Sequence, residues 1–208
     1  MRIETCVVGV MSANCYLLIN DKLKETVIID PGDQADIIKR KIEELGVKPV
    51  GILLTHGHFD HIMAAPELAE EYQIKIYAAE AEAQLLSDDK TNCSGMIRRR
   101  FTLKADILLK NEESINLADI NIKIIDTPGH TVGGACYYIE DQNVLFSGDT
   151  LFFESVGRTD FPTGDIRSLL NSIEQRLLVL PDEVKVYPGH GDTTTIGHEK
   201  NNNPFILA

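Results

Sequence analysis

The chain contains no tryptophan and only four cysteines among its 208 residues. These cysteines, Cys6, Cys15, Cys93 and Cys136, are irregularly spaced and form no Cys-x-x-Cys pair. Such sparse thiols are not the disulfide framework of a small secreted protein and fit a reducing compartment. We therefore expect four free, mostly buried thiols and a cytoplasmic protein.

Basic residues and long apolar runs are also scarce. Twenty lysines and arginines face 32 aspartates and glutamates, and the formal net charge of −12 would repel a phosphate backbone, so we expect no nucleic-acid partner. A membrane span needs about 18 uncharged apolar residues. The apolar opening 6–19 is interrupted by Ser12 and Asn14, so no membrane partner is expected either. Glu4 and the lack of a small-residue cleavage site argue against a secretory signal, and we interpret this opening as a strand pair.

Short apolar runs, in contrast, are plentiful. Hydrophobic residues make up 43% of the chain, and a chain of this length buries about 70% of its unfolded surface, so we expect one domain over residues 1–208. Strands are predicted where β-branched runs end at turn or breaker residues. These runs are Cys15–Asn20, Thr26–Ile29, Val50–Leu54, Ile74–Ala78, Ile120–Ile125, Ala135–Ile139, Asn143–Ser147 and Val184–Tyr187.

Helical patterns lie between some of these runs. Apolar residues recur at helical spacing from Ile38 to Leu45 and stop at Gly46. A clearer helix is predicted after an Asp165 N-cap, with an apolar stripe that ends before Pro181. The fold class is therefore a mixture of helix and sheet, α/β (α+β), with residues 87–104 as a polar excursion over one edge.

Three of the six histidines fall within Thr55-His56-Gly57-His58-Phe59-Asp60-His61. This segment directly follows a predicted buried strand, where the functional loops of layered folds gather. Positions i and i+2 of an extended loop point the same way, so His56 and His58 can converge on one metal ion. Asp60 and His61 enter the next helix and can turn toward a second ion.

Three further candidate ligands follow other predicted strands. His130 and His190 each come directly after a strand and a Pro-Gly pair, and Asp149 follows the strand that ends at Ser147. Imidazole and carboxylate ligands without thiolate suit zinc, iron or manganese. Two carboxylates offset only half the charge of two divalent ions, and a bound hydroxide would offset more.

The order and spacing of these seven residues closely resemble the metallo-β-lactamase superfamily. The resemblance implies a four-layer αβ/βα sandwich, the metallo-β-lactamase fold, with two divalent metal ions, most commonly zinc, at one edge. It implies that one metal is held by His56, His58 and His130 and the other by Asp60, His61 and His190, with Asp149 as a bridge. Asp30 lies in a motif similar to the family's early Asp-Gly. The resemblance implies that Asp30 contacts the metal ligands without binding a metal itself; the alternative is that it caps a turn.

Several branches of the superfamily are set aside by individual residues. The antibiotic-hydrolysing enzymes usually carry cysteine at the position of Asp149, and flavodiiron oxygen reductases carry glutamate at the position of His58. The family's nucleases need a basic surface, which the net charge of −12 does not provide.

The chain also resembles the hydroxyacylglutathione hydrolase (glyoxalase II) group and its single-domain relatives. The segments that carry this resemblance are 148–152, 157–161, 164–165, 188–191, 193–197 and 203–205, together with Glu199. Only 18 residues follow His190 in this sequence, so we expect it to lack the helical C-terminal domain of two-domain glyoxalase II, and the glutathione specificity is left open. The related persulfide dioxygenases keep much the same ligand string around one iron.

The expected function is metal-dependent hydrolysis of a small-molecule acyl thioester, such as a hydroxyacylglutathione. A metal lowers the pKa of bound water from 15.7 to about 7 and so provides hydroxide at neutral pH. Asp60 and Asp149 are the predicted catalytic carboxylates, which orient this hydroxide or accept its proton. The alternatives are a mononuclear-iron persulfide dioxygenase, a lactonase or other ester hydrolase, and a catalytically silent metal-binding protein.

Four arginines are candidate substrate-binding residues. Arg158 follows the Asp149 motif and can bind a substrate carboxylate or hold its own loop through Asp160. The basic run Arg98, Arg99 and Arg100 can receive an anionic substrate at the mouth of the site, or can be solvated surface. His198 lies in a polar tail and is expected to be a surface residue. The oligomeric state is not predicted.

Overall fold

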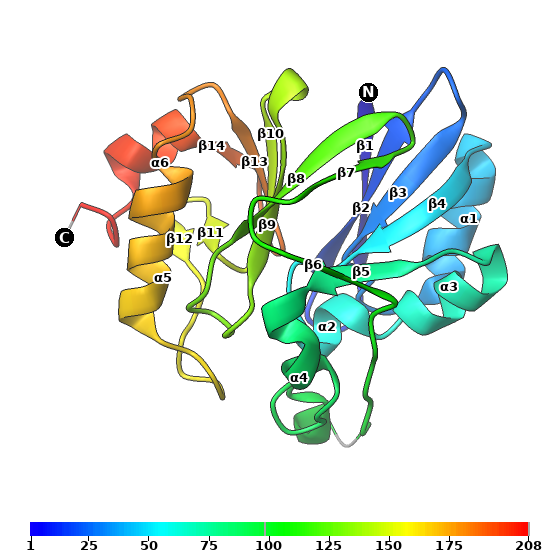
Figure 1. The fold of residues 1–208 in the computed structure, drawn as a ribbon, viewed down its shortest axis with the longest axis horizontal. Helices are drawn as coiled ribbons and strands as arrows, with labels where there is room; N and C mark the ends of the chain where they lie inside the picture. The colour runs from blue at the N-terminus through cyan, green and yellow to red at the C-terminus, as the bar shows by residue number, and fades with distance from the viewer. Residues whose placement is uncertain (98, 208) are drawn as a thin grey trace.

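Two β-sheets face each other at the centre of the molecule, and helices cover the outer side of each (Figure 1). The computed structural model describes residues 1–97 and 99–207. Within these residues, each large sheet has six strands. The small pair β11 (Leu151–Phe152) and β12 (Ser155–Val156) lies next to the second sheet.

The first sheet comes from the first half of the chain, and its strand order follows the sequence. Its strands are β1 (Arg2–Val8), β2 (Ala13–Asn20), β3 (Glu25–Ile29), β4 (Lys48–Leu53), β5 (Ile76–Ala79) and β6 (Ile107–Leu109). β1 to β3 pair antiparallel, so the opening of the chain is a strand pair as predicted. β3 to β6 pair in parallel.

The second sheet has the order β14-β13-β10-β9-β8-β7. Its strands are β7 (Ser114–Leu117), β8 (Ile120–Asp126), β9 (Ala135–Ile139), β10 (Val144–Gly148), β13 (Lys185–Pro188) and β14 (Thr194–Thr195). β10 is parallel to β13, and β9 is antiparallel to both β8 and β10. β8, β10 and β13 therefore run in the same direction, and their carboxyl ends lie at one edge.

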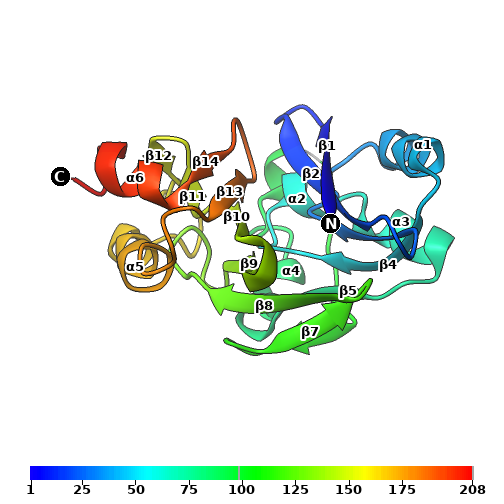
Figure 2. The same cartoon turned by 90° about the horizontal axis from the view of Figure 1, so that it is seen from above.

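The helices form the two outer layers. They are α1 (Ala35–Leu45), α2 (Phe59–Ile62), α3 (Ala65–Tyr72), α4 (Ala83–Leu86), α5 (Ile166–Ser172) and α6 (Ile196–Asn202). In Figure 2, α1 and α3 lie on one side of the two sheets, and α5 and α6 lie on the other. Gly46 ends α1 in the left-handed conformation, and the Asp165 carboxylate accepts a hydrogen bond from the Ser168 amide (2.7 Å) at the start of α5, both as predicted.

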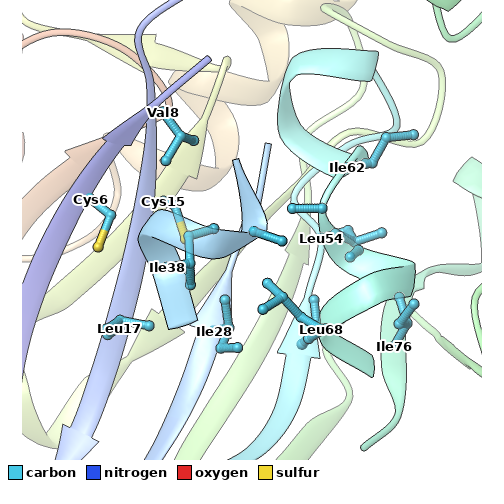
Figure 3. Packing of buried hydrophobic residues seen from close by; sticks show 14 of the residues in the cluster. Cys6, Val8, Cys15, Leu17, Ile28, Ile38, Leu54, Ile62, Leu68 and Ile76 are labelled. Atoms are coloured by element: carbon cyan, nitrogen blue, oxygen red, sulfur yellow. The ribbon is translucent and has the colours of Figure 1, made fainter. Parts of the chain in front are cut away.

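Side chains that alternate along the strands sort the apolar residues into three clusters. On β2, Cys15 and Leu17 belong to the cluster under α1 and α3 (Figure 3), whereas Tyr16 and Leu18 belong to the cluster between the sheets. The third cluster joins the second sheet to α5 and includes Cys136, Leu145, Leu169 and Val186. Three apolar layers between four layers of backbone confirm the predicted αβ/βα sandwich.

The eight predicted strands agree with the structure to within two residues at each end. The prediction omitted β6, β7, β14 and the β11–β12 pair, which are short. The four cysteines are buried and free, as expected. In the part of the chain that the structure describes, no helix is long and apolar enough to cross a membrane. The excursion 87–104 is largely irregular, with a 3-10 turn at Ser94–Ile97.

Candidate metal centre

Four strands of the two sheets deliver the candidate ligands to one edge, and a fifth delivers Asp30. β4 leads to His56 and His58, β8 leads to His130, and β10 and β13 lead to Asp149 and His190. β3, which is parallel to β4, leads to Asp30, and Asp60 and His61 lie on α2. The structure thus brings together all seven predicted ligands, although they come from four separate segments of the chain.

His56, His58 and His130 form the first cluster. All three are buried, and one nitrogen from each lies within 4.8 Å of the others. His58 Nδ1 is 2.8 Å from His130 Nε2. The other nitrogen of His130, Nδ1, is 2.7 Å from the Arg158 carbonyl oxygen, which only accepts hydrogen bonds. The His130 proton is therefore on Nδ1, and the Nε2 lone pair faces the cluster.

Asp60, His61 and His190 form the second cluster, with donor atoms again within 4.8 Å of one another. His190 Nε2 is 3.3 Å from both Asp60 Oδ2 and His61 Nε2. His61 is fully buried, and its Nδ1 is 3.0 Å from Asp30 Oδ2. Asp30 also accepts hydrogen bonds from the amide (2.8 Å) and hydroxyl (2.5 Å) of Thr55. Asp30 thus connects the strand end of β4 to His61.

Asp149 lies between the two clusters. Its Oδ2 is 3.5 Å from His130 Nε2 of the first cluster, and its Oδ1 is 3.4 Å from His61 Nε2 of the second. Gly189 makes this approach possible, because a Cβ there would lie 2.2 Å from Asp149 Oδ1 and 2.7 Å from His61 Cε1.

The two clusters differ in their protonation. Burial and the neighbouring imidazoles lower the pKa of His58 to about 3 and hold that of His56 far below its usual range, so both are neutral. Burial also opposes charge on His61, but Asp149, Asp60 and Asp30 outweigh it and raise its pKa to about 10. For Asp60, burial is outweighed by His61 and His190, which lower its pKa. A metal ion would replace the proton on His61.

This donor set fits two divalent cations. His56 Nε2, His58 Nε2 and Asp149 Oδ1 are buried and have no hydrogen-bond partner among the described residues. Buried polar atoms are normally paired, so these atoms indicate a missing partner. Neutral imidazoles and carboxylates without thiolate are the ligands of zinc, iron and manganese. The geometry defines a candidate dinuclear metal centre.

Two residues that hold His190 have no signal in the sequence. Asn14 Nδ2 on β2 donates to the carbonyls of Pro188 and Gly191 (3.0 Å each), and the Tyr16 hydroxyl donates to Pro188 (2.6 Å). These three bonds connect β2 of the first sheet to the end of β13 and the loop that follows it. Sequence reasoning missed them because the partners are more than 170 residues away.

A cavity of about 330 Å³ opens over the ligands. Besides metal-centre residues it is lined by apolar side chains, among them Phe59, Phe152, Val156 and Phe161. A second cavity, of about 280 Å³, shares Met11, Phe59 and Asp60 with the first, so the two adjoin.

The predicted substrate-binding arginines have different environments. Arg158 lines the first cavity, with its guanidinium 4.0 Å from the centroid of Phe161 and bonded to Asp160 (2.6 and 2.7 Å). Arg99 lines the second cavity, 3.7 Å from Asp33. Arg100 is paired with Asp89 (3.4 Å) and lines neither cavity. Arg98 lies outside the described residues.

His198 is not part of the centre. It is partly exposed, pairs with Glu154 (3.0 Å) and stacks on Phe153. This agrees with its prediction as a surface residue.

The family follows from comparison with known proteins. The model of the metallo-β-lactamase superfamily matches residues 8–190, so the chain belongs to this superfamily. It is 40% identical over 201 residues to the probable metallo-hydrolase YqgX of Bacillus subtilis (strain 168), covering 96% of this chain and 94% of that protein. It is 37% identical over 213 residues to the hydroxyacylglutathione hydrolase GloC of Haemophilus influenzae, covering 99% of this chain and 98% of that protein.

Solved structures show the same fold. The BLEG-1 B3 metallo-β-lactamase superposes with a TM-score of 0.94 at 39% identity and covers 100% of both chains. TTHA1623, solved in a di-iron-bound form, has a TM-score of 0.83 at 33% identity, covering 97% of this chain and 99% of that one. With its candidate metal centre, the chain is a metal-dependent hydrolase of the superfamily.

Proposed function

We propose that the protein hydrolyses a small-molecule acyl thioester, such as a hydroxyacylglutathione, with zinc as its metal. The observation that carries the proposal is the arrangement of the donors, in which two clusters lie on either side of Asp149 beneath a largely apolar cavity. The 37% identity to a hydroxyacylglutathione hydrolase supports the choice of a thioester.

In this proposal His56, His58 and His130 would hold one ion, and Asp60, His61 and His190 would hold the other. Asp149, which lies between the two clusters, would be available to either ion. Two bound divalent ions would lower the pKa of a water molecule and polarise the substrate carbonyl.

The two carboxylates of the centre act on the attacking water. Beside a bound divalent cation, Asp60 would be an ionised carboxylate and would accept a hydrogen bond from this water. Asp149 faces both clusters and orients the same water. The water oxygen joins the acyl carbon, the carbon–sulfur bond breaks and the sulfur takes a proton, so the products are a carboxylic acid and a thiol.

The cavity suits a substrate with an apolar centre and charged ends. Phe152, Val156 and Phe161 exclude water from the reacting carbonyl. Arg158 and Arg99, one in each adjoining cavity, are within the reach of substrate carboxylates. Both arginines already pair with aspartates, so each would favour an anionic substrate only modestly.

The experiment measures metal content and S-lactoylglutathione hydrolysis on the purified, zinc-loaded protein. We expect two metal ions per chain and oxygen-independent hydrolysis. His58→Ala should reduce hydrolysis by about a hundredfold or more, and His198→Ala, which removes a histidine outside the centre, should retain it. The proposal is contradicted if the zinc-loaded protein does not cleave thioesters, or if one iron per chain supports oxygen-consuming persulfide oxidation instead.

A second candidate activity is β-lactam hydrolysis. The aspartate at position 149, where β-lactamases usually carry cysteine, argued against this activity. The solved structure with a TM-score of 0.94 is a B3 metallo-β-lactamase, and this similarity supports it. A β-lactam assayed beside the thioester on the same protein distinguishes the two. A higher kcat/KM for the β-lactam would replace the thioester proposal and leave the metal centre unchanged.

A further inference from the structure

Glu82 is a buried acid that the chemistry above does not use. It ends the 3-10 turn Glu80–Glu82 between β5 and α4, and only 1% of its surface is exposed. Acids are almost never fully buried unless they are paired. The groups that pair with Glu82 therefore indicate its role.

Both carboxylate oxygens of Glu82 accept hydrogen bonds from the loops of the first cluster. Oε1 accepts from the Gly57 amide (2.9 Å), and Oε2 accepts from the Gly133 amide (2.8 Å). Gly57 lies between His56 and His58, and Gly133 lies three residues after His130. One carboxylate thus connects the two loops that carry the three imidazoles.

Packing around these glycines is tight. A Cβ at Gly57 would lie 2.6 Å from Leu85 on α4, and a Cβ at Gly133 would lie 2.3 Å from the Glu82 amide nitrogen. The segment 82–86 is therefore the support on which both loops rest. The 2.8 Å between His58 Nδ1 and His130 Nε2 depends on the positions of these loops.

The contact requires a carboxylate rather than any polar group. Two amide N–H groups point at Glu82, and an ionised carboxylate offers an acceptor to each. A glutamine of the same shape has one acceptor and one donor. Its NH₂ group would face an N–H, so one of the two loops would lose its partner.

We propose that Glu82 is a positioning residue for the metal centre, which holds the loops of His56, His58 and His130 at the spacing that one divalent ion requires. It differs from Asp30, which contacts a ligand side chain directly. The proposal rests on the metal centre and not on the thioester substrate, so failure of the thioesterase assay would leave it standing.

The test is the zinc affinity of Glu82→Gln, measured by competition with a chromophoric chelator and without substrate. Loss of groups that orient metal ligands weakens binding about tenfold to a hundredfold, and we expect a loss in this range for one of the two ions. Glu199→Gln is the matched control. Glu199 is fully buried and accepts bonds from Glu154, Thr194 and Asn203, none of them in a ligand loop of the first cluster.

The control separates positioning from general stability. Both variants should lower the melting temperature of the metal-free protein, but only Glu82→Gln should weaken zinc binding. Unchanged zinc affinity in Glu82→Gln, or an equal loss in Glu199→Gln, would overturn the proposal. If Glu82→Gln does not fold, Glu82→Asp takes its place, because this shorter carboxylate cannot reach both amides. Glu82→Asp with wild-type zinc affinity would overturn the proposal equally.

Discussion

Asp30→Asn should disable the second metal cluster while leaving the fold intact. The Asp30 side chain is 2% exposed, and the Asp30 backbone has a φ of 49°, a conformation that asparagine tolerates. The substituted amide keeps a carbonyl for the Thr55 amide. Its NH₂ group, however, faces His61 Nδ1, which is 3.0 Å from Asp30 Oδ2 in the native protein. To regain a bond, His61 must move its proton to Nε2, and that nitrogen then has no lone pair for a metal.

The magnitude follows from this tautomer change. Loss of a group that orients a ligand costs about 10- to 100-fold in metal affinity, or about 1.4 to 2.7 kcal/mol. In the metal-free protein, the lost hydrogen bond to a charged imidazole costs about 1.5 to 3 kcal/mol. For a chain of this length, that corresponds to a decrease of about 3 to 12 °C in melting temperature.

The assay is chelator competition for zinc, combined with thermal unfolding of the metal-free protein. Glu199→Gln again serves as the control, because it alters a buried carboxylate whose hydrogen-bond partners are Glu154, Thr194 and Asn203 and not His61. Asp30→Asn with two zinc ions bound at wild-type affinity would refute the reasoning. A turn-capping role for Asp30 would lower the melting temperature without changing the affinity.

Four further predictions concern the centre and its surroundings. His58→Ala and Asp149→Ala should each reduce turnover by about a hundredfold or more, with an unchanged circular dichroism spectrum, because both lie at the sheet edge; full turnover of either would exclude it from the centre. Arg158→Ala should weaken hydrolysis of an anionic thioester by about fivefold relative to a neutral ester, and an equal loss on both would assign Arg158 to its loop. Tyr16→Phe removes the buried hydrogen bond from the Tyr16 hydroxyl to the Pro188 carbonyl and should lower the free energy of unfolding in urea by about 1 to 2 kcal/mol. A decrease of less than about 0.5 kcal/mol would show that this bond contributes little. In the metal-free protein, the pKa of His58 is lowered to about 3, so stability should decrease as the pH falls from 6.5 toward 3. The pKa of His61 is raised to about 10, so stability should also decrease as the pH rises from 6.5 toward 10. Urea midpoints that do not peak between pH 3 and pH 10 would contradict the assigned protonation.

The sequence predicted the ligand edge because each ligand follows a strand with a recognisable end. A buried apolar run, a breaker and a histidine or aspartate are all local features, and parallel strands then bring such ends together. Local patterns also located Gly46 and Asp165, whose conformation and cap the structure confirms.

The contacts that hold the ligands were not predictable in this way. Glu82 is one acid among 32 acidic residues, and the sequence around it has no motif. Its partners Gly57 and Gly133 lie 25 and 51 positions away in the chain. The Tyr16 hydroxyl bonds to a carbonyl 172 positions away, next to the His190 loop. Such contacts depend on how the two sheets pack, which periodicity does not encode.

The central claim is tested most directly by a crystal structure of the zinc-loaded protein, with anomalous diffraction recorded on both sides of the zinc absorption edge. The account predicts two zinc peaks per chain, one within bonding distance of His56, His58 and His130 and the other of Asp60, His61 and His190, with Asp149 in contact with both. Absence of zinc from this edge, or zinc bound by other residues, would contradict it.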